Sequence, residues 1–230
     1  MLPNALGLCA PFIVDPELRI LDIGSGGLPF VRATTVVDPF PEDAPDQNYQ
    51  RGGGQFKQPE GVEYVQAFGE DLPFEDQSFD FVYCSETLNH CNDPVKVIEE
   101  MKRVAPAGYI DVPSATLDLF EPHVIHLWRC FDLGGEIEGQ HHLGFNRREP
   151  GDGILKRVET FIGHLTWARE GMLYQEYAAR VHRVLIGMYI QFVWSKPEDL
   201  YASFFTDEQV LPNPEGVAET FQRLLGGAGQ

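Results

Sequence analysis

The stretch from Phe68 to His90 reads FGEDLPFEDQSFDFVYCSETLNH. Its first half is rich in acidic residues, glycine and proline, and an apolar run from Phe79 to Cys84 follows. A short apolar run bounded by turn-forming residues is typical of a strand buried inside a parallel sheet. The residues after Cys84 are mostly polar, so the stretch predicts a strand that delivers polar side chains to one edge of a sheet.

Similar runs lie on both sides of this stretch. Apolar and β-branched residues form three runs before it and one run after it, at Arg19–Ile23, Thr34–Val37, Val62–Gln66 and Tyr109–Val112. Each run is short and bounded by glycine, proline or aspartate, as buried strands are. The sequence therefore predicts five strands between residues 19 and 113.

A helix is expected between the last two of these strands. Asp93 and Pro94 provide an N-cap and a first-turn proline, and Val97, Met101 and Val104 recur at helical spacing. Strands that alternate with helices favour an α/β fold with a mostly parallel sheet and right-handed crossovers.

The remainder of the chain is predicted to belong to the same single domain, residues 1–230. Residues 40–61 are rich in proline, glycine and acidic residues, which indicates a loop over one edge of a site. Residues 113–187 are expected to cap the sheet with helices and a hairpin, whose strands are Leu127–Phe131 and Leu143–Asn146. Residues 188–230 would hold the last strand, Tyr189–Trp194, in antiparallel orientation.

Composition limits the possible partners. The chain of 230 residues has 17 Lys and Arg against 35 Asp and Glu, a formal net charge of −18. Binding to nucleic acid or to an anionic membrane rests on clustered cations, so neither partner is expected. The four cysteines form no CxxC pair, and no apolar run approaches the roughly 20 residues that span a bilayer. We expect a cytoplasmic protein without a signal peptide.

Two loops are candidate ligand sites. Asp22, Gly24 and Gly26 end the first predicted strand, and Asp38 ends the second. Glycine allows a ligand to approach the backbone, and a carboxylate after the second strand of such a sheet can bind ribose hydroxyls. Each feature also has a simple alternative, a tight turn for the glycines and a solvated turn residue for Asp38. A nicotinamide fingerprint would need glycine at position 29, where Pro29 stands.

Together these motifs resemble the class I S-adenosylmethionine-dependent methyltransferases, and most closely their broad type 11 group. The stretch from Phe68 to His90, the glycine loop, Asp38 and the later helix and strand follow one another in the order and spacing of that family. The resemblance covers about residues 19–113. It implies a Rossmann-like, doubly wound, mostly parallel sheet of seven strands with a helical or hairpin insertion capping the site.

The resemblance also implies a set of cofactor-binding residues for S-adenosylmethionine. The glycine loop would bind the methionine end, Asp38 the ribose, the segment at Phe68 the adenine, and the end of the fourth strand would border the cofactor. These residues are Asp22, Gly24, Ser25, Gly26, Asp38, Phe68, Gly69, Glu70, Cys84 and Glu86. Phe68 replaces a polar residue of the family, which favours stacking on adenine. Glu86 replaces a common histidine.

The candidate catalytic residues are His90, Glu86 and His126. The methyl donor is already activated, so orientation and proton removal are the main tasks of such an enzyme. His123, His126, His141 and His142 lack the carboxylates of a known metal motif, and no metal is expected. The leading hypothesis is methyl transfer to an O, N or C nucleophile of a small molecule, and the alternative is a non-catalytic binding protein with this fold.

Overall fold

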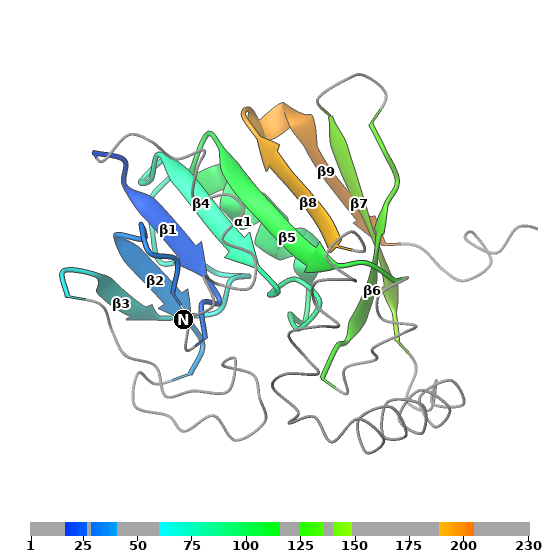
Figure 1. Ribbon diagram of the computed structural model, residues 1–230, viewed down its shortest axis with the longest axis horizontal. Helices are drawn as coiled ribbons and strands as arrows, with labels where there is room; N and C mark the ends of the chain where they lie inside the picture. The colour runs from blue at the N-terminus through cyan, green and yellow to red at the C-terminus, as the bar shows by residue number, and fades with distance from the viewer. Residues whose placement is uncertain are drawn as a thin grey trace, which may run out of the picture.

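The computed structural model describes residues 17–26, 29–40, 60–115, 125–135, 140–148 and 189–204, which form two sheets and one α-helix (Figure 1). The main sheet has the strand order β3-β2-β1-β4-β5-β8, and a smaller sheet has the order β6-β7-β9. The main-sheet strands are β1 (Ile20–Ile23), β2 (Thr35–Asp38), β3 (Glu63–Gln66), β4 (Phe81–Ser85), β5 (Gly108–Pro113) and β8 (Tyr189–Trp194). The smaller sheet contains β6 (Trp128–Asp132), β7 (His141–Arg147) and β9 (Leu200–Phe204), and a short 3-10 helix, η3 (Pro197–Asp199), precedes β9.

The main sheet is parallel through its first five strands. The chain runs from β1 outward to β2 and β3, then returns to the other side of β1 for β4 and β5. Its direction of winding therefore reverses between β1 and β4. In open α/β sheets a crevice forms at such a point, outside the carboxyl ends of the strands. The predicted parallel α/β architecture is thus confirmed.

The helix α1 (Pro94–Val104) covers one face of the sheet. The Asp93 carboxylate caps it by accepting the Lys96 N–H at 2.9 Å, and Pro94 occupies the first turn, as the sequence predicts. Its buried face, with Val97 and Met101, packs in one core cluster with buried side chains of β1, β4 and β5. This packing fixes the loops at both ends of the helix relative to the strand edge.

The opposite face of the sheet carries a row of aromatic rings. Phe30, from the segment between β1 and β2, stacks on Tyr83 with 4.4 Å between ring centroids, and Tyr83 stacks on Tyr109 at 5.4 Å. Ile20 and Val36 complete this second core cluster. Residues 24–26 and 29–34, the described part of the connection from β1 to β2, contain no helix.

The smaller sheet is joined to the main body by specific contacts. The indole N–H of Trp128 donates to the Cys91 carbonyl at 2.8 Å, and the Lys102 ammonium donates to the Leu200 carbonyl at 2.7 Å. The expected late strand pair is present as β6 and β7, which run antiparallel. β8 is antiparallel to β5 as predicted, but it is not the last strand, since β9 follows it and pairs with β7.

Two further expectations concern regions beyond those described. Within the described residues the main sheet has six strands, so the seventh strand implied by the resemblance is not among them. The predicted helices between residues 155 and 188, and most of the loop 40–61, lie outside the described ranges. No helix within these ranges is long and apolar enough to cross a membrane.

Candidate functional site

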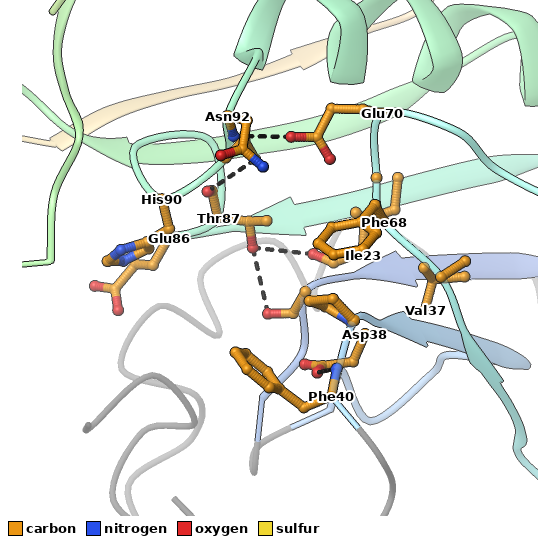
Figure 2. Close-up of a pocket in the computed structure, with 15 residues that line it drawn as sticks. Ile23, Val37, Asp38, Phe40, Phe68, Glu70, Glu86, Thr87, His90 and Asn92 are labelled. Carbon is orange, nitrogen blue, oxygen red and sulfur yellow. Dashed lines mark hydrogen bonds between the residues drawn. The ribbon is translucent and has the colours of Figure 1, made fainter. Parts of the chain in front are cut away.

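A pocket of about 180 Å³ lies at the carboxyl ends of β1, β2 and β4, beside the loop after β3 (Figure 2). It is lined by Ile23, Gly24, Val37, Asp38, Pro39, Phe40, Ala67, Phe68, Gly69, Glu70, Glu86, Thr87, His90, Cys91 and Asn92. This is the sheet edge at which the winding direction reverses, so the pocket occupies the position at which such folds bind ligands.

The glycine loop after β1 is shaped by its neighbours. Gly24 and Gly26 have φ values of +71° and +55°, which favour glycine. The Gly24 N–H donates to the Val37 carbonyl at 2.7 Å. A β-carbon on Gly24 would lie 2.4 Å from the side chain of Thr87, which fills that space. Glycine is therefore required at position 24 by both conformation and packing.

Asp38 connects the glycine loop to the turn after β2. Its Oδ2 accepts the Gly26 N–H at 3.2 Å, and its Oδ1 accepts the Phe40 N–H at 2.9 Å. The residue is only 3% exposed, so it is not a solvated turn aspartate. A carboxylate accepts up to roughly four hydrogen bonds, so these two bonds are compatible with a ligand hydroxyl as well.

Asp22 lies behind the pocket rather than in its lining. It is buried, and its Oδ2 accepts the Phe30 N–H at 2.7 Å. Burial raises the pKa of Asp22 to about 7, with a further contribution from the charge of Asp38. Its carboxyl group thus anchors the chain that follows the glycine loop. Ser25, Gly26 and Cys84 are likewise absent from the lining.

Cys84 is fully buried in the core next to α1. Burial raises the pKa of its thiol well above the usual range, and the charge of Asp22 adds to this effect. A neutral thiol in such surroundings behaves as a small apolar side chain. The neighbouring Cys91 does line the pocket, and its thiol, whose pKa burial also raises, donates to the Thr87 carbonyl at 3.2 Å.

The end of the pocket near β2 and β3 presents apolar surface. Phe40 is 37% exposed and Phe68 is 57% exposed, unusual values for phenylalanine, and Val37 and Ala67 lie beside them in the lining. Glu70 also lines the pocket, but its Oε1 accepts the N–H groups of Asn92 and Asp93 at 2.8 and 3.3 Å. Glu70 thereby fixes the entry to α1, and the exposed ring of Phe68 can stack on a planar ligand group.

At the end of the pocket near β4, the backbone and the carboxylate of Glu86 are both fixed by hydrogen bonds. Glu86 has a φ of +52°, and its N–H donates to the Asp111 carbonyl at 2.8 Å. The Tyr189 hydroxyl donates to Glu86 Oε1 at 2.8 Å. Asp111 is buried beside this pair, and its pKa is raised to about 8, first by burial and then by the charge of Glu86.

His90, like Glu86, lines the pocket (Figure 2). Its Nδ1 is 3.3 Å from the Ile125 carbonyl, a contact that a proton on Nδ1 would satisfy. Such a proton leaves Nε2 as the basic nitrogen of the neutral ring. His126 meets His90 edge to face at 4.8 Å between centroids, yet is not itself in the lining.

The other histidines considered for a metal lie elsewhere. His141 stacks on Phe192 at 4.0 Å, and His142 Nε2 is 2.9 Å from the Ser203 hydroxyl. His123 lies outside the described residues. Among the residues that the structure describes, no three His, Cys, Asp or Glu side chains are grouped to hold a metal ion.

The structure therefore brings together six of the expected cofactor residues and two of the catalytic candidates. These are Gly24, Asp38, Phe68, Gly69, Glu70 and Glu86, with Glu86 and His90 as the catalytic candidates. Three residues of the site, Thr87, Phe40 and Tyr189, were not predicted from the sequence. Their roles depend on contacts between segments distant in the chain, and no local pattern marks them.

Comparison with known proteins assigns the same region to a family. Residues 21–110 match the family model described as "Methyltransferase domain". Over 98 residues the chain is 35% identical to the uncharacterized methyltransferase YcgJ of Bacillus subtilis, a match covering 38% of this chain and 36% of that protein. Over 82 residues it is 39% identical to the ubiquinone/menaquinone biosynthesis C-methyltransferase UbiE of Xanthomonas campestris, covering 34% and 32%. The chain thus spans about a third of these relatives.

The chain was also compared with solved protein structures. The crystal structure of the YcgJ protein from Bacillus subtilis aligns with a TM-score of 0.38 at 20% identity, covering 57% of this chain and 70% of that chain. The matched residues 21–110 contain the glycine loop, Asp38 and the turn after β4. Residues 21–110 therefore match a methyltransferase domain, the family that the sequence motifs resemble.

Proposed function

We propose that this protein transfers a methyl group from S-adenosylmethionine to an O, N or C nucleophile of a small molecule, for example a sugar or a natural product. The observation that supports this most directly is the pocket at the reversal point of the sheet, with Asp38 buried at the end of β2. When bound there, S-adenosylmethionine supplies a methyl group activated by a positively charged sulfur.

The residues of the pocket fit this cofactor in charge. Asp38, Glu70 and Glu86 are acidic, and none of the fifteen lining residues is lysine or arginine. An acidic lining attracts a ligand that carries a sulfonium and an ammonium group. The same lining opposes an anionic ligand such as a free phosphate.

The pocket also fits the cofactor in the placement of its polar and apolar side chains. Asp38 would accept hydrogen bonds from the ribose, and Phe40 and Phe68 would stack on the adenine, at the end where apolar side chains gather. Gly24, Gly69 and Glu70 would contact the cofactor along the floor of the pocket. Asp22, Ser25, Gly26 and Cys84 would contribute by setting the conformation of the loop and the strand ends.

Proton removal is assigned to the β4 end of the pocket. Glu86 and His90 lie there together, and His90 Nε2 is the basic nitrogen if the Ile125 carbonyl accepts from Nδ1. His126 would act through its ring contact with His90. A positioned base of this kind typically contributes about 10²–10⁴-fold to the rate.

The first test is calorimetric titration of the purified chain with S-adenosylmethionine and S-adenosylhomocysteine, with NAD as a control. We expect both adenosyl ligands to bind with dissociation constants of the order of micromolar and NAD not to bind. If neither adenosyl ligand binds, the proposed function is wrong. Binding without turnover across a broad acceptor screen would instead favour a non-catalytic binding protein.

A further inference from the structure

The turn after β4 holds Glu86 in an uncommon backbone conformation. Its φ of +52° lies in the left-handed region, which residues other than glycine seldom adopt. The hydrogen bond from its N–H to the Asp111 carbonyl helps to stabilise this conformation. Non-glycine residues in this region are often found at functional sites, where surrounding contacts offset the strain. Glu86 therefore enters the pocket lining from a backbone that β5 fixes.

A second element fixes the side chain. Tyr189, the first residue of β8, lies opposite Pro113 in the antiparallel pairing of β8 with β5. Its hydroxyl donates to Glu86 Oε1 at 2.8 Å. Within the described part of the chain, the other carboxylate oxygen, Oε2, accepts no hydrogen bond. Tyr189 thus orients the carboxylate and leaves one oxygen for a ligand.

The other acids of the pocket differ from Glu86 in this respect. Asp38 accepts backbone N–H groups at both oxygens, and Glu70 accepts two N–H groups at the entry to α1. Asp111, buried behind Glu86, has its pKa raised to about 8, so near pH 7 it is mostly protonated and adds little charge. Glu86 is therefore the carboxylate at the β4 end that can interact with a cation.

We propose that Glu86, oriented by Tyr189, is a charge-recognition residue at the reactive end of the pocket. It binds the positively charged centre of the methyl donor and distinguishes the donor from its neutral thioether product. The proposal rests on the proposed function, because that function places the donor in this pocket. Transfer of the methyl group removes the positive charge, so the attraction to Glu86 ends with the reaction and the product is exchanged for fresh donor.

The test compares two probes that differ in charge at the reactive centre. S-adenosylhomocysteine has a neutral thioether there, whereas sinefungin carries a protonated amine. Calorimetry at low ionic strength would measure both probes on the wild-type protein and on Glu86→Gln, Tyr189→Phe and Glu99→Gln. Glu99 is an exposed residue of α1 outside the pocket, so Glu99→Gln is the matched control for loss of one acidic charge.

We expect the wild type to bind sinefungin at least about tenfold more tightly than S-adenosylhomocysteine, since a partly buried ion pair is screened less than an exposed one. Glu86→Gln should reduce this preference to within about twofold, with little change in affinity for S-adenosylhomocysteine. Tyr189→Phe should lower the preference by about threefold, because the carboxylate loses its orienting bond. Glu99→Gln should retain the preference.

Two kinds of failure can be told apart. If the wild type binds S-adenosylhomocysteine but shows no preference for sinefungin, or if Glu86→Gln keeps the preference, the charge-recognition role is wrong and the proposed function stands. If Tyr189→Phe keeps the full preference for sinefungin over S-adenosylhomocysteine, Tyr189 does not position Glu86. If S-adenosylhomocysteine does not bind the wild type, the proposed function itself fails.

Discussion

The side chain of Thr87 occupies the space that a β-carbon on Gly24 would need: Cγ2 and Oγ1 of Thr87 both lie 2.4 Å from that position. Thr87 belongs to the turn after β4 and Gly24 to the loop after β1, so this contact joins the two walls of the pocket. The Thr87 hydroxyl strengthens the junction, because it lies 3.0 Å from the Ile23 carbonyl and 3.3 Å from the Gly24 carbonyl.

Gly24→Ala should lower the free energy of unfolding by about 2–4 kcal/mol, because alanine disfavours a φ of +71° and its methyl group would collide with Thr87. Urea denaturation measures this change. The matched control is Gly61→Ala, where φ is +80° but nothing lies within 4 Å of the new methyl group. We expect Gly61→Ala to lower the free energy of unfolding by only about 1 kcal/mol. Equal losses in the two variants would contradict a packing role for Thr87.

Thr87→Val should weaken binding of S-adenosylhomocysteine by about tenfold, since it removes the hydroxyl that joins the two walls and preserves the volume of the side chain. Thr87→Ser, which keeps the hydroxyl, should bind within about threefold of wild type. Thr34→Val is the control. Thr34 Oγ1 bonds the main chain of Ile20 at the opposite end of β1, so its loss affects stability and not affinity. Calorimetry of all three variants would measure their affinities for S-adenosylhomocysteine. If Thr87→Val bound as tightly as the wild type, the Thr87 hydroxyl would have no role in positioning the two walls of the pocket.

Asp38→Ala should weaken cofactor binding by about 1–3 kcal/mol, because it leaves ribose hydroxyls and the N–H groups of Gly26 and Phe40 without their acceptor. The control is Asp80→Ala, since Asp80 also accepts a backbone N–H, that of Arg19, at the end of β1 away from the pocket. Titration with S-adenosylhomocysteine gives the affinities. The assignment of Asp38 to the ribose would be abandoned if both variants bound equally well.

The stability of the protein should decrease with pH between about 4 and 7 because of Asp22. Its pKa is 3.8 in the unfolded chain and about 7 in the folded protein, so the folded state retains the proton over this range and loses relative stability as pH rises. This increase in the pKa of Asp22 corresponds to a change of at most about 4 kcal/mol in the free energy of unfolding.

Asp22→Asn isolates this contribution, since an amide oxygen can still accept the Phe30 N–H. Denaturation of both proteins at pH 5 and pH 8 should show that the free energy of unfolding decreases less with pH in the variant than in the wild type. The prediction fails if the two proteins lose the same stability.

His90→Ala should lower turnover by about 10²–10⁴-fold, once an acceptor has been found by screening, and leave the affinity for S-adenosylhomocysteine unchanged. His126→Ala should have a smaller effect, because His126 reaches the pocket only through its contact with His90. His142→Ala is the control, since its ring bonds Ser203 in the smaller sheet. Full turnover in His90→Ala would show that His90 has only a structural role.

Local sequence patterns encode the first five strands, the helix and the order of the motifs. Short apolar runs predicted β1 to β5, a capping aspartate and helical spacing predicted α1, and the order of motifs predicted the family and the position of the glycine loop and Asp38. These features depend on residues within a few positions of one another, so a single sequence specifies them.

The set of side chains that forms the pocket depends instead on contacts between segments that are distant in the sequence. Strand pairing brings Tyr189 to Glu86 across 103 positions, and the meeting of two loops places Thr87 against Gly24. Burial decided that Asp22 and Cys84 lie behind the pocket, whereas Phe40 and Phe68 remain exposed at it. Pairing register and burial follow from the whole chain packing at once, so no local pattern could have revealed these contacts.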